Sequence, residues 1–277
     1  MIIIDLNQVM ISNIMQQLGN HTNATLEENM VRHMVLNSLL SYKKKFSSEY
    51  GELVIACDNK NVWRKKVFPY YKANRKKVKE NSDTDWKSIF ECLSNIREEL
   101  KTFFPYKVVD VESAEADDVI ATITRNSDEK TLILSGDKDF IQLHSKNVDQ
   151  YDPVRKKFIK HDNPRTFLFE HILKGDSGDG IPNILSNDDV FISGTRQKPM
   201  TAKRIKNYME TPLAEMDNES RRNFQRNEML IDLKFTPKEI QDMILDQFNS
   251  QKKDKSQLMN YFIKNKLKNL MEHIGEF

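Results

Sequence analysis

Residues 131–139 read TLILSGDKD, a short apolar run that leads through a glycine into two aspartates. An apolar run of this length beside a glycine is typical of a buried strand. A similar run at Met1–Leu6 carries Asp5 at its end, and another at Leu53–Cys57 is followed at once by Asp58. Because parallel strands end at the same edge of a sheet, we expect these aspartates to lie near one another.

Helical patterns alternate with these strands along the first half of the chain. Trp86–Phe104 has apolar residues at helical spacing, and Ser113–Thr124 starts with a serine that suits a helix cap. The alternation predicts an α/β fold with a mostly parallel central sheet and flanking helices. The later pattern is helical and ends in a helix expected at Ser256–Ile274. We therefore expect an α/β core at 1–152 and an all-helical subdomain at 153–277.

The composition is that of a globular protein of the cell interior. Of 277 residues, 38% are hydrophobic, with 15 phenylalanines and 12 methionines, which is enough for a core. Two cysteines, Cys57 and Cys92, suit a reducing compartment. The sequence has no apolar run of about 18 residues and no export signal at its start, so we expect a cytoplasmic protein without membrane contact. We also expect it to be a monomer.

Positive charge is concentrated in two runs, although the net charge is only +2. The segment 59–79 has nine basic residues and no acidic one, and the segment 190–209 has five more. Basic runs around tight acidic groups indicate a polyanionic partner with cations at the centre of the site. The basic residues are Lys60, Arg64, Lys65, Lys66, Lys72, Arg75, Lys76, Lys77 and Lys79, followed by Arg196, Lys198, Lys203, Arg204 and Lys206.

The acidic groups suggest a metal site. Besides Asp5 and Asp58, they are 115–118 (EADD), 137–139 (DKD) and 176–179 (DSGD). Each alone fits an ordinary turn or helix cap. Gathered in one cleft they would raise one another's pKa, and divalent cations would relieve the repulsion. Oxygen ligands without a nearby cysteine or histidine pair favour Mg²⁺ or Mn²⁺ over zinc. We interpret all six histidines as surface or core residues: His21, His33, His144, His161, His171 and His273.

Four segments in a fixed order resemble the 5′-nuclease family, which includes flap endonucleases and the 5′ nuclease domain of bacterial DNA polymerase I. They are 71–75 (YKANR), 115–118 (EADD), 135–143 (SGDKDFIQL) and 175–182 (GDSGDGIP). Their order and spacing are most similar to the T-even phage ribonuclease H branch. The resemblance implies a PIN-like 5′-nuclease core with a helical arch, followed by a helical subdomain with a helix–three-turn–helix.

The resemblance also implies a two-metal phosphodiesterase that uses Mg²⁺, with Mn²⁺ as a substitute. One ion would lower the pKa of a water, and the other would stabilise the leaving 3′ oxygen. By analogy, five acids surround the first ion directly or through water, and three more belong to the second. Asp118 lies behind them and is a further candidate catalytic residue. The first group is Asp5, Asp58, Glu115, Asp117 and Asp137, and the second is Asp139, Asp176 and Asp179.

The basic run at about 59–85 is similar to the arch over the family's active site. Lys72 and Arg75 match arch cations that contact the scissile phosphate, so the resemblance implies a catalytic role for both. Tyr70 and Tyr71 are candidates for stacking on an unpaired base. The segment that begins at Thr201 resembles the second helix of the helix–three-turn–helix. The candidate nucleic-acid contacts are Arg64, Lys65, Tyr70, Tyr71, Lys203 and Arg204.

The implied substrates are branched or 5′-ended duplex DNA and RNA–DNA hybrid. We expect a 5′ to 3′ exonuclease and flap endonuclease with ribonuclease H activity that removes primers in phage replication, in the host cell cytoplasm. RNA primers, 5′ flaps and nicked duplex ends stay open as preferred substrates, because fold and motif do not fix specificity. A single-stranded DNA-binding protein of the replication machinery is a candidate partner.

Three alternative functions fit the sequence less well. An aspartate-nucleophile phosphatase would have a second aspartate two residues after Asp5, where this chain has Asn7. A small toxin-type ribonuclease would lack so long an arch and the helical subdomain. A catalytically weak, structure-specific DNA-binding protein would lack at least one of the metal acids, and none is missing.

Overall fold

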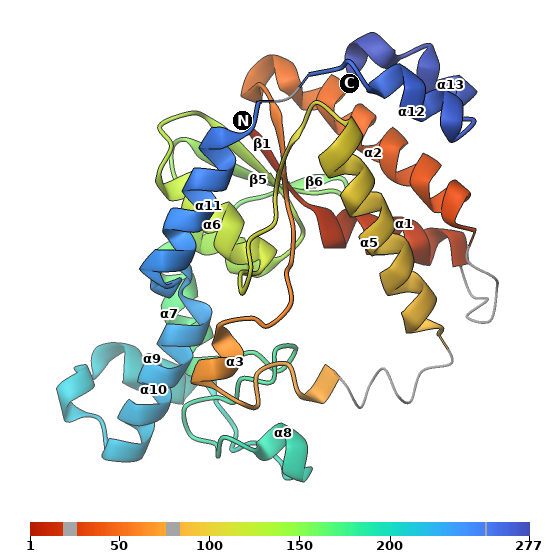
Figure 1. Cartoon of the computed structure of the whole chain (residues 1–277). Coiled ribbons are helices and arrows are strands. Elements are labelled where there is room, and N and C mark those ends of the chain that lie inside the picture. The colour runs from red at the N-terminus through yellow and green to blue at the C-terminus, as the bar shows by residue number, and fades with distance from the viewer. Residues whose placement is uncertain (19–26, 76–83, 253) are drawn as a thin grey trace.

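A six-stranded sheet forms the centre of the chain in a computed structural model that describes residues 1–277 except 19–26, 76–83 and 253 (Figure 1). The strand order is β3-β2-β1-β4-β5-β6. All neighbouring strands are parallel except β6, which pairs antiparallel with β5. The predicted mostly parallel sheet is confirmed. The strands are β1 (Ile2–Asp5), β2 (Leu53–Ala56), β3 (Lys107–Val109), β4 (Thr131–Leu134), β5 (Val148–Asp152) and β6 (Lys157–Ile159).

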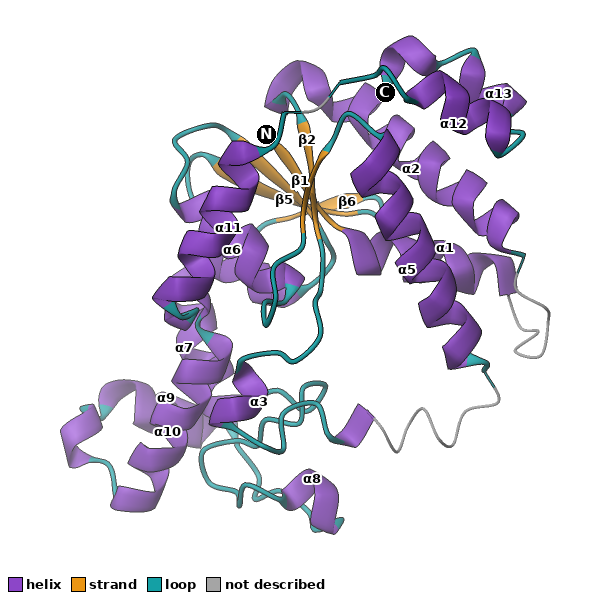
Figure 2. Ribbon diagram, in the orientation of Figure 1, coloured by secondary structure: helices purple, strands orange, loops and turns teal. Residues whose placement is uncertain are grey.

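The sheet is buried on both faces, and Figure 2 shows helices on either side of it. Side chains of β1 alternate between two cores: Ile2 and Ile4 join one, and Ile3 joins the other. All three side chains are fully buried. Parallel strands covered on both faces read as continuous apolar runs, which is why β1, β2 and β4 could be recognised in the sequence, whereas β5 and β6 were not predicted.

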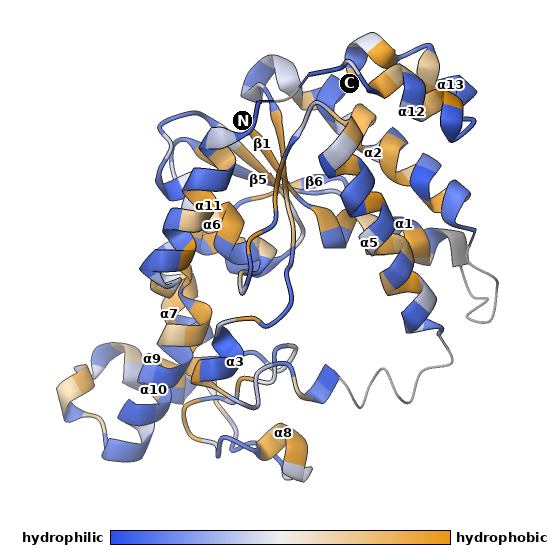
Figure 3. Cartoon of the chain, in the orientation of Figure 1, coloured by the Kyte–Doolittle hydropathy of each residue, from blue (hydrophilic) through white to orange (hydrophobic). Residues whose placement is uncertain are grey.

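Helices from distant parts of the chain cover the two faces. One face packs against α1, α2, α5, α12 and α13, and the other against α6 and α11. Figure 3 shows these helices with hydrophobic and hydrophilic sides. Within the described ranges, no helix is long and apolar enough to cross a membrane. The helices are α1 (Leu6–Leu18), α2 (Glu28–Tyr50), α5 (Trp86–Phe103), α6 (Ala116–Arg125), α11 (Lys238–Ser250), α12 (Leu258–Lys264) and α13 (Lys268–Met271).

The start of α6 differs from the prediction. The helix begins at Ala116, and its cap is Glu115 rather than Ser113. Ser113 has φ 66° and lies in the turn before the helix. Glu115 and Asp118 form a reciprocal capping box, in which each side chain accepts a hydrogen bond from the other residue's backbone N–H. The capping box therefore fixes two of the candidate acids at the start of one helix.

A third apolar core holds the helical region after the sheet. Phe68 and Tyr71 of the arch segment pack there with Ile172, Ile184 and Phe224. The arch segment is therefore anchored on the helical region as well as on the sheet. The remaining elements are α3 (Arg64–Val67), α7 (Pro164–Lys174), α8 (Val190–Ser193), α9 (Ala202–Glu210) and α10 (Asn218–Ile231), with 3-10 helices η1 (Lys138–Leu143), η2 (Leu213–Glu215), η3 (Leu233–Phe235) and η4 (Ile274–Glu276).

The boundary expected at residue 152 differs from the observed architecture. β6 continues the sheet to Ile159. The C-terminal residues return to the α/β core, where the rings of Phe262 and Phe277 lie 6.1 Å and 5.8 Å from that of Phe104. The single helix expected near the end is two short ones, because Lys266 adopts φ 56°, which a helix does not allow.

Two glutamines cover the outer edge of β3: Gln247 lies in α11, and Gln251 follows directly after that helix. Gln251 accepts a hydrogen bond from the backbone N–H of Val108 at 3.1 Å and donates one to its carbonyl at 3.0 Å. Gln247 accepts one from the N–H of Asp110 at 2.8 Å. An unpaired sheet edge invites association with other strands, and these amides satisfy part of it.

Candidate active site

Carboxylates meet at the edge of the sheet where the parallel strands end. Asp5 is the last residue of β1 and is paired in register with Ala56 of β2, two residues before Asp58. Asp137 follows β4, the other neighbour of β1. The start of α6 brings Glu115 and Asp117 to the same edge. The sequence-based expectation that these acids lie together agrees with their positions.

The strand-end acids are tied to neighbouring elements. Asp58 accepts a hydrogen bond from the backbone N–H of Ala116 at 2.7 Å and another from the side chain of Asn7 at 2.5 Å. Asp5 accepts one from the N–H of Gln8 at 3.2 Å. These bonds fix the carboxylates relative to α1 and α6, so the acids form a defined cluster.

The pKa values show how closely the acids approach. Burial, reinforced by the charge of Asp58, raises the pKa of Asp5 to about 7. Burial and the charge of Asp137 hold the pKa of Asp117 well above its usual value. The pKa of Asp137 is also raised, chiefly by burial, and that of Asp139 is raised to about 7 by burial and the charge of Asp137. Such shifts are expected where buried carboxylates converge, and they mark functional sites.

Two arch cations lie on this cluster. The Nζ atom of Lys72 is 2.5 Å from a carboxylate oxygen of Glu115 and 3.4 Å from one of Asp179, and Arg75 pairs with Asp179. Burial raises the pKa of Glu115, but Lys72 and Arg64 outweigh it and hold that pKa below its usual value. The cations therefore keep Glu115 ionised among acids with raised pKa values.

The backbone of Lys72 is in the left-handed region, with φ 56°. Its N–H donates a hydrogen bond of 2.7 Å to the carbonyl of Asp179. Gly180, with φ 71°, lies so close that a Cβ there would be 3.0 Å from the carbonyl oxygen of Tyr70. A non-glycine residue in this region costs roughly 1–3 kcal/mol, so the contact between the two loops holds Lys72 in place.

Asp118 lies behind the cluster, as the resemblance implied. It is fully buried and accepts hydrogen bonds from Arg64, Trp63 and Thr236, the last at 2.7 Å. It holds Arg64 against the start of α6 and does not reach the cavity itself, so the structure gives it no contact with the reacting groups.

Two predicted nucleic-acid contacts need correction. Arg64 is 2% exposed, and its guanidinium lies 2.9 Å from both Glu115 and Asp118. Tyr71 is also 2% exposed, and its hydroxyl donates to Glu115 at 2.9 Å and lies 3.0 Å from Asp179. Neither side chain is accessible to a phosphate or a base, because Arg64 is paired with buried acids and the Tyr71 hydroxyl is hydrogen-bonded to them.

The other candidate contacts lie at the surface. Tyr70 is 37% exposed, and Lys65 is exposed on α3. Lys203 and Arg204 are exposed at the start of α9, and Thr201, where the resemblance placed the beginning of a helix, is its cap. All four side chains reach solvent, although Arg204 also donates a hydrogen bond of 2.6 Å to the carbonyl of Pro199.

The second acid group is built on a tight loop. A Cβ at Gly175 would lie 2.3 Å from the carbonyl oxygen of Ile181, so only glycine fits at this φ of 66°. Asp176 turns one carboxylate oxygen, Oδ1, towards the N–H groups of Gly178 and Asp179, at 2.7 Å and 3.1 Å. This leaves its other oxygen directed towards the site.

His171 also belongs to this group, and the interpretation of every histidine as a surface or core residue is wrong for it. Its Nδ1 atom lies 3.2 Å from Asp139, and its Nε2 atom lies 3.5 Å from Asp176. Burial lowers the pKa of His171, but the two aspartates outweigh it and raise the pKa above its usual value. Its place five residues before Asp176, in a helix that ends at the acid loop, was the available signal.

The donor set fits divalent cations. In the described part of the chain, Asp139, His171 and Asp176 can place one ligand atom each within 4.8 Å of one another. They line a cavity of about 470 Å³ that also reaches Asp137 and Lys174. Oxygen-rich sites with one imidazole suit hard or borderline divalent ions.

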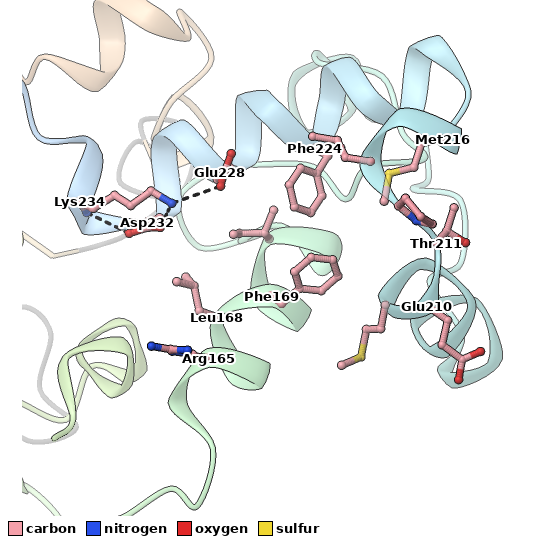
Figure 4. A pocket seen from close by; sticks show the side chains of 14 residues that line it. Arg165, Leu168, Phe169, Glu210, Thr211, Met216, Phe224, Glu228, Asp232 and Lys234 are labelled. Carbon is pink, nitrogen blue, oxygen red and sulfur yellow. Dashed lines mark hydrogen bonds and ion pairs between the residues drawn. The ribbon is translucent and has the colours of Figure 1, made fainter. Parts of the chain in front are cut away.

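A second hollow, of about 570 Å³, lies away from these acids between α7, α9 and α10 (Figure 4). Its floor is apolar, with Phe169, Phe224 and Met216, and Arg165 lies at one end. It contains none of the candidate acids, so it is not the reaction site.

Family comparisons agree with this geometry. Residues 1–168 match the family described as 5′-3′ exonuclease, N-terminal resolvase-like domain, and residues 164–277 match the family described as T4 RNase H, C terminal. The chain belongs to the 5′-3′ exonuclease family and is a nuclease.

Individual relatives place it within that family. The chain is 32% identical over 291 residues to Ribonuclease H of Enterobacteria phage T4, covering 99% of this chain and 95% of that protein. It is 33% identical over 133 residues to Flap endonuclease Xni of Shewanella sp. (strain MR-4), covering 44% of this chain and 48% of that protein. A structure of a T5 protein co-crystallised with metal ions matches with a TM-score of 0.62 and 18% identity, over 90% of this chain and 98% of the other, which supports the fold.

Proposed function

We propose that this nuclease hydrolyses phosphodiester bonds near the 5′ ends of DNA and of RNA primers paired to DNA, with two divalent cations. Mg²⁺ is the proposed cofactor, and Mn²⁺ substitutes for it. The observation that carries the proposal is the meeting of acids from β1, β2, β4 and α6 at one sheet edge, where the pKa values of Asp5, Asp117 and Asp137 are raised. When bound, two such ions would activate a water and stabilise the leaving oxygen.

The chain's own residues supply the rest of the site. The first ion would be held by Asp5, Asp58, Glu115, Asp117 and Asp137, and the second by Asp139, Asp176 and Asp179. Lys72 and Arg75 would turn to the scissile phosphate, because a cation that faces carboxylates can equally face a phosphate at the same position. Lys72 contributes positive charge where negative charge develops during the reaction.

Exposed residues on either side of the site would hold the substrate. Lys65 and Tyr70 lie on the arch segment, and Tyr70 offers a ring for an unpaired base. Lys203 and Arg204 at the start of α9 would bind duplex phosphates. A structure of the T5 flap endonuclease contains DNA and metal ions, and the T4 relative is named Ribonuclease H; both support a nucleic-acid substrate, and the match to the 5′-3′ exonuclease family supports a 5′ end.

A digestion in Mg²⁺ tests the proposal. The wild-type chain and Asp137→Asn are compared on a 5′-labelled flap, an RNA–DNA hybrid and a single strand. We expect cleavage of at least one duplex substrate, and less than a tenth of that turnover in the variant with DNA affinity retained. A chain that binds the flap without cutting any substrate is instead a structure-specific binding protein. Wild-type turnover in Asp137→Asn would contradict the metal assignment.

A further inference from the structure

The imidazole of His171 lies between two carboxylates of the proposed second metal group. Its Nδ1 atom faces Asp139 at 3.2 Å, and its Nε2 atom faces Asp176 at 3.5 Å. The side chain is 16% exposed, and it opens on the cavity that both aspartates line. Each ring nitrogen therefore has a carboxylate partner at the same site.

The other histidines that the structure describes have different surroundings. His144 pairs with the amide of Gln150 at 2.8 Å, and His33 with Asn37 at 2.9 Å. His161 accepts from the backbone N–H of Asn163, and His273 is paired with Glu276 at the surface. Within the described ranges, His171 is thus the histidine that is set between two acids of the candidate site.

The spacing of the three side chains suits one cation. Their ligand atoms lie within 4.8 Å of one another. Ligands on opposite sides of one ion stand about 4.2 Å apart, since each bond is about 2.1 Å, so small side-chain movements close the site. A histidine that binds a metal with one nitrogen commonly donates its other N–H to a carboxylate, and His171 has a carboxylate beside each nitrogen.

The backbone around the site is held firmly. Asp176 and Ile181 exchange two backbone hydrogen bonds of 2.8 Å and 2.7 Å, which close the loop directly after α7. Asp176 follows the negative end of α7, where a carboxylate is unfavourable unless a positive charge lies beside it. The ring of Phe167 packs edge-on against His171 with centroids 6.0 Å apart. These contacts leave the imidazole oriented towards the acids.

We propose that His171 is a ligand of the second divalent cation, together with Asp139 and Asp176, and that it shifts this site towards Mn²⁺ relative to Mg²⁺. Mg²⁺ prefers oxygen ligands and keeps its waters, whereas imidazole is a better ligand for transition metals. The inference rests on the proposed two-metal function, and it adds a nitrogen ligand to a group otherwise made of carboxylates.

Mn²⁺ binding to the full chain without nucleic acid tests this directly. Electron spin-echo envelope modulation detects a nitrogen bonded to Mn²⁺, and labelling all histidines with ¹⁵N changes that signal without changing the fold. The ¹⁴N modulation should be present in wild-type protein, be replaced in the ¹⁵N-labelled protein, and be absent from His171→Gln. His161→Gln is the matched control, because it removes a neighbouring imidazole outside the site and should leave the signal unchanged.

Calorimetric titration provides the second readout. His171→Gln should lower the affinity for Mn²⁺ roughly 10-fold, the lower end of the range for losing a group that supports a metal site, with a smaller loss for Mg²⁺. Two bound Mn²⁺ ions without nitrogen modulation in wild-type protein would overturn the inference and leave the two-metal function intact. A persistent signal in His171→Gln, or equal losses for both ions, would also overturn it. A chain that binds no divalent ion would overturn both proposals.

Discussion

The two basic runs of this chain are alike in composition and differ in where their side chains go. In the first, Arg64 is buried against Glu115 and Asp118, and Lys72 lies on the acid cluster. In the second, Lys203 and Arg204 stay exposed at the start of α9. The difference teaches that a cation of such a run is withdrawn from the surface where buried carboxylates lie opposite it, and stays exposed where none do.

The largest expected effect comes from the buried cation. Arg64→Ala leaves Asp118 without its charged partner and Glu115 with Lys72 alone, and removal of one member of a buried ion pair costs about 3–5 kcal/mol. Urea denaturation should show this loss in the free energy of unfolding. Lys65→Ala, one residue further on and exposed, should change it by less than about 0.5 kcal/mol. Equal losses of unfolding free energy in the two variants would mean that the buried ion pairs of Arg64 do not stabilise the fold.

The next effect concerns the half-buried cation. Lys72→Ala should slow the single-turnover cleavage of a flap roughly 100-fold, about 2.7 kcal/mol, because it removes positive charge from the reacting phosphate. Affinity for the substrate should change little. Lys72→Asn is the matched variant, since asparagine tolerates φ 56° better than alanine does. If only the alanine variant were slow, backbone strain and not lost charge would be the cause.

The acids opposite the first run should show a pH-dependent cost. The pKa of Asp5 is about 7 in the folded chain and about 3.9 when unfolded, so its contribution to stability falls as the pH rises from about 4 to about 7. In EDTA, Asp5→Asn should therefore raise the melting temperature at pH 7.5 by roughly 2–4 °C, about 1 kcal/mol, and hardly change it at pH 4.

Mg²⁺ should reverse the order of the two melting temperatures, so that the wild-type chain becomes the more stable one. At pH 7.5, saturating Mg²⁺ should raise the melting temperature of the wild-type chain more than that of Asp5→Asn, because an ion that binds only the folded state stabilises it. Thermal scans over a Mg²⁺ titration measure both effects. A melting temperature that ignores Mg²⁺ would argue against a metal at this sheet edge.

The smallest effect on the molecule should come from the exposed run. Lys203→Ala combined with Arg204→Ala should leave the free energy of unfolding within about 0.5 kcal/mol of wild type. At saturating enzyme, the double variant should cleave the flap at nearly the wild-type rate. Only DNA affinity should fall, and the slope of log K against log salt should decrease by roughly 1–2, since fewer counterions are released. A rate that stays low at saturation would place these residues in the reaction.

The sheet and its acids could be predicted because their signals are local. β1 and β4 each read as an apolar run that leads to an acid, Asp5 and Asp137, and parallel pairing brings these positions to one edge. Arg64 could not be predicted correctly in the same way. It is buried because it meets Asp118 and the carbonyl of Leu230, which lies 166 residues away. In the sequence, nothing distinguishes Arg64 from the other basic residues of the segment 59–79, which suggest a solvent-exposed surface.

His171 and the final helices were missed for different reasons. The role of His171 depends on α7 packing against the turn that carries Asp139, a long-range contact without a local pattern. The break between α12 and α13 depends on one residue, Lys266, in a left-handed conformation that lysine rarely adopts. Apolar periodicity continues through that position, so it predicted one helix where there are two.

The two glutamines that cover the outer edge of β3 have a consequence for folding during synthesis of the chain. All six strands have been made by Ile159, but the two glutamines that cover the outer edge of β3 stand at 247 and 251. At roughly 5–20 residues per second, a ribosome needs several seconds or more to reach them. During that interval the nascent sheet would keep an open edge of the kind that pairs with neighbouring chains. A chain stalled or truncated before α11 should therefore aggregate even though its strands are all present.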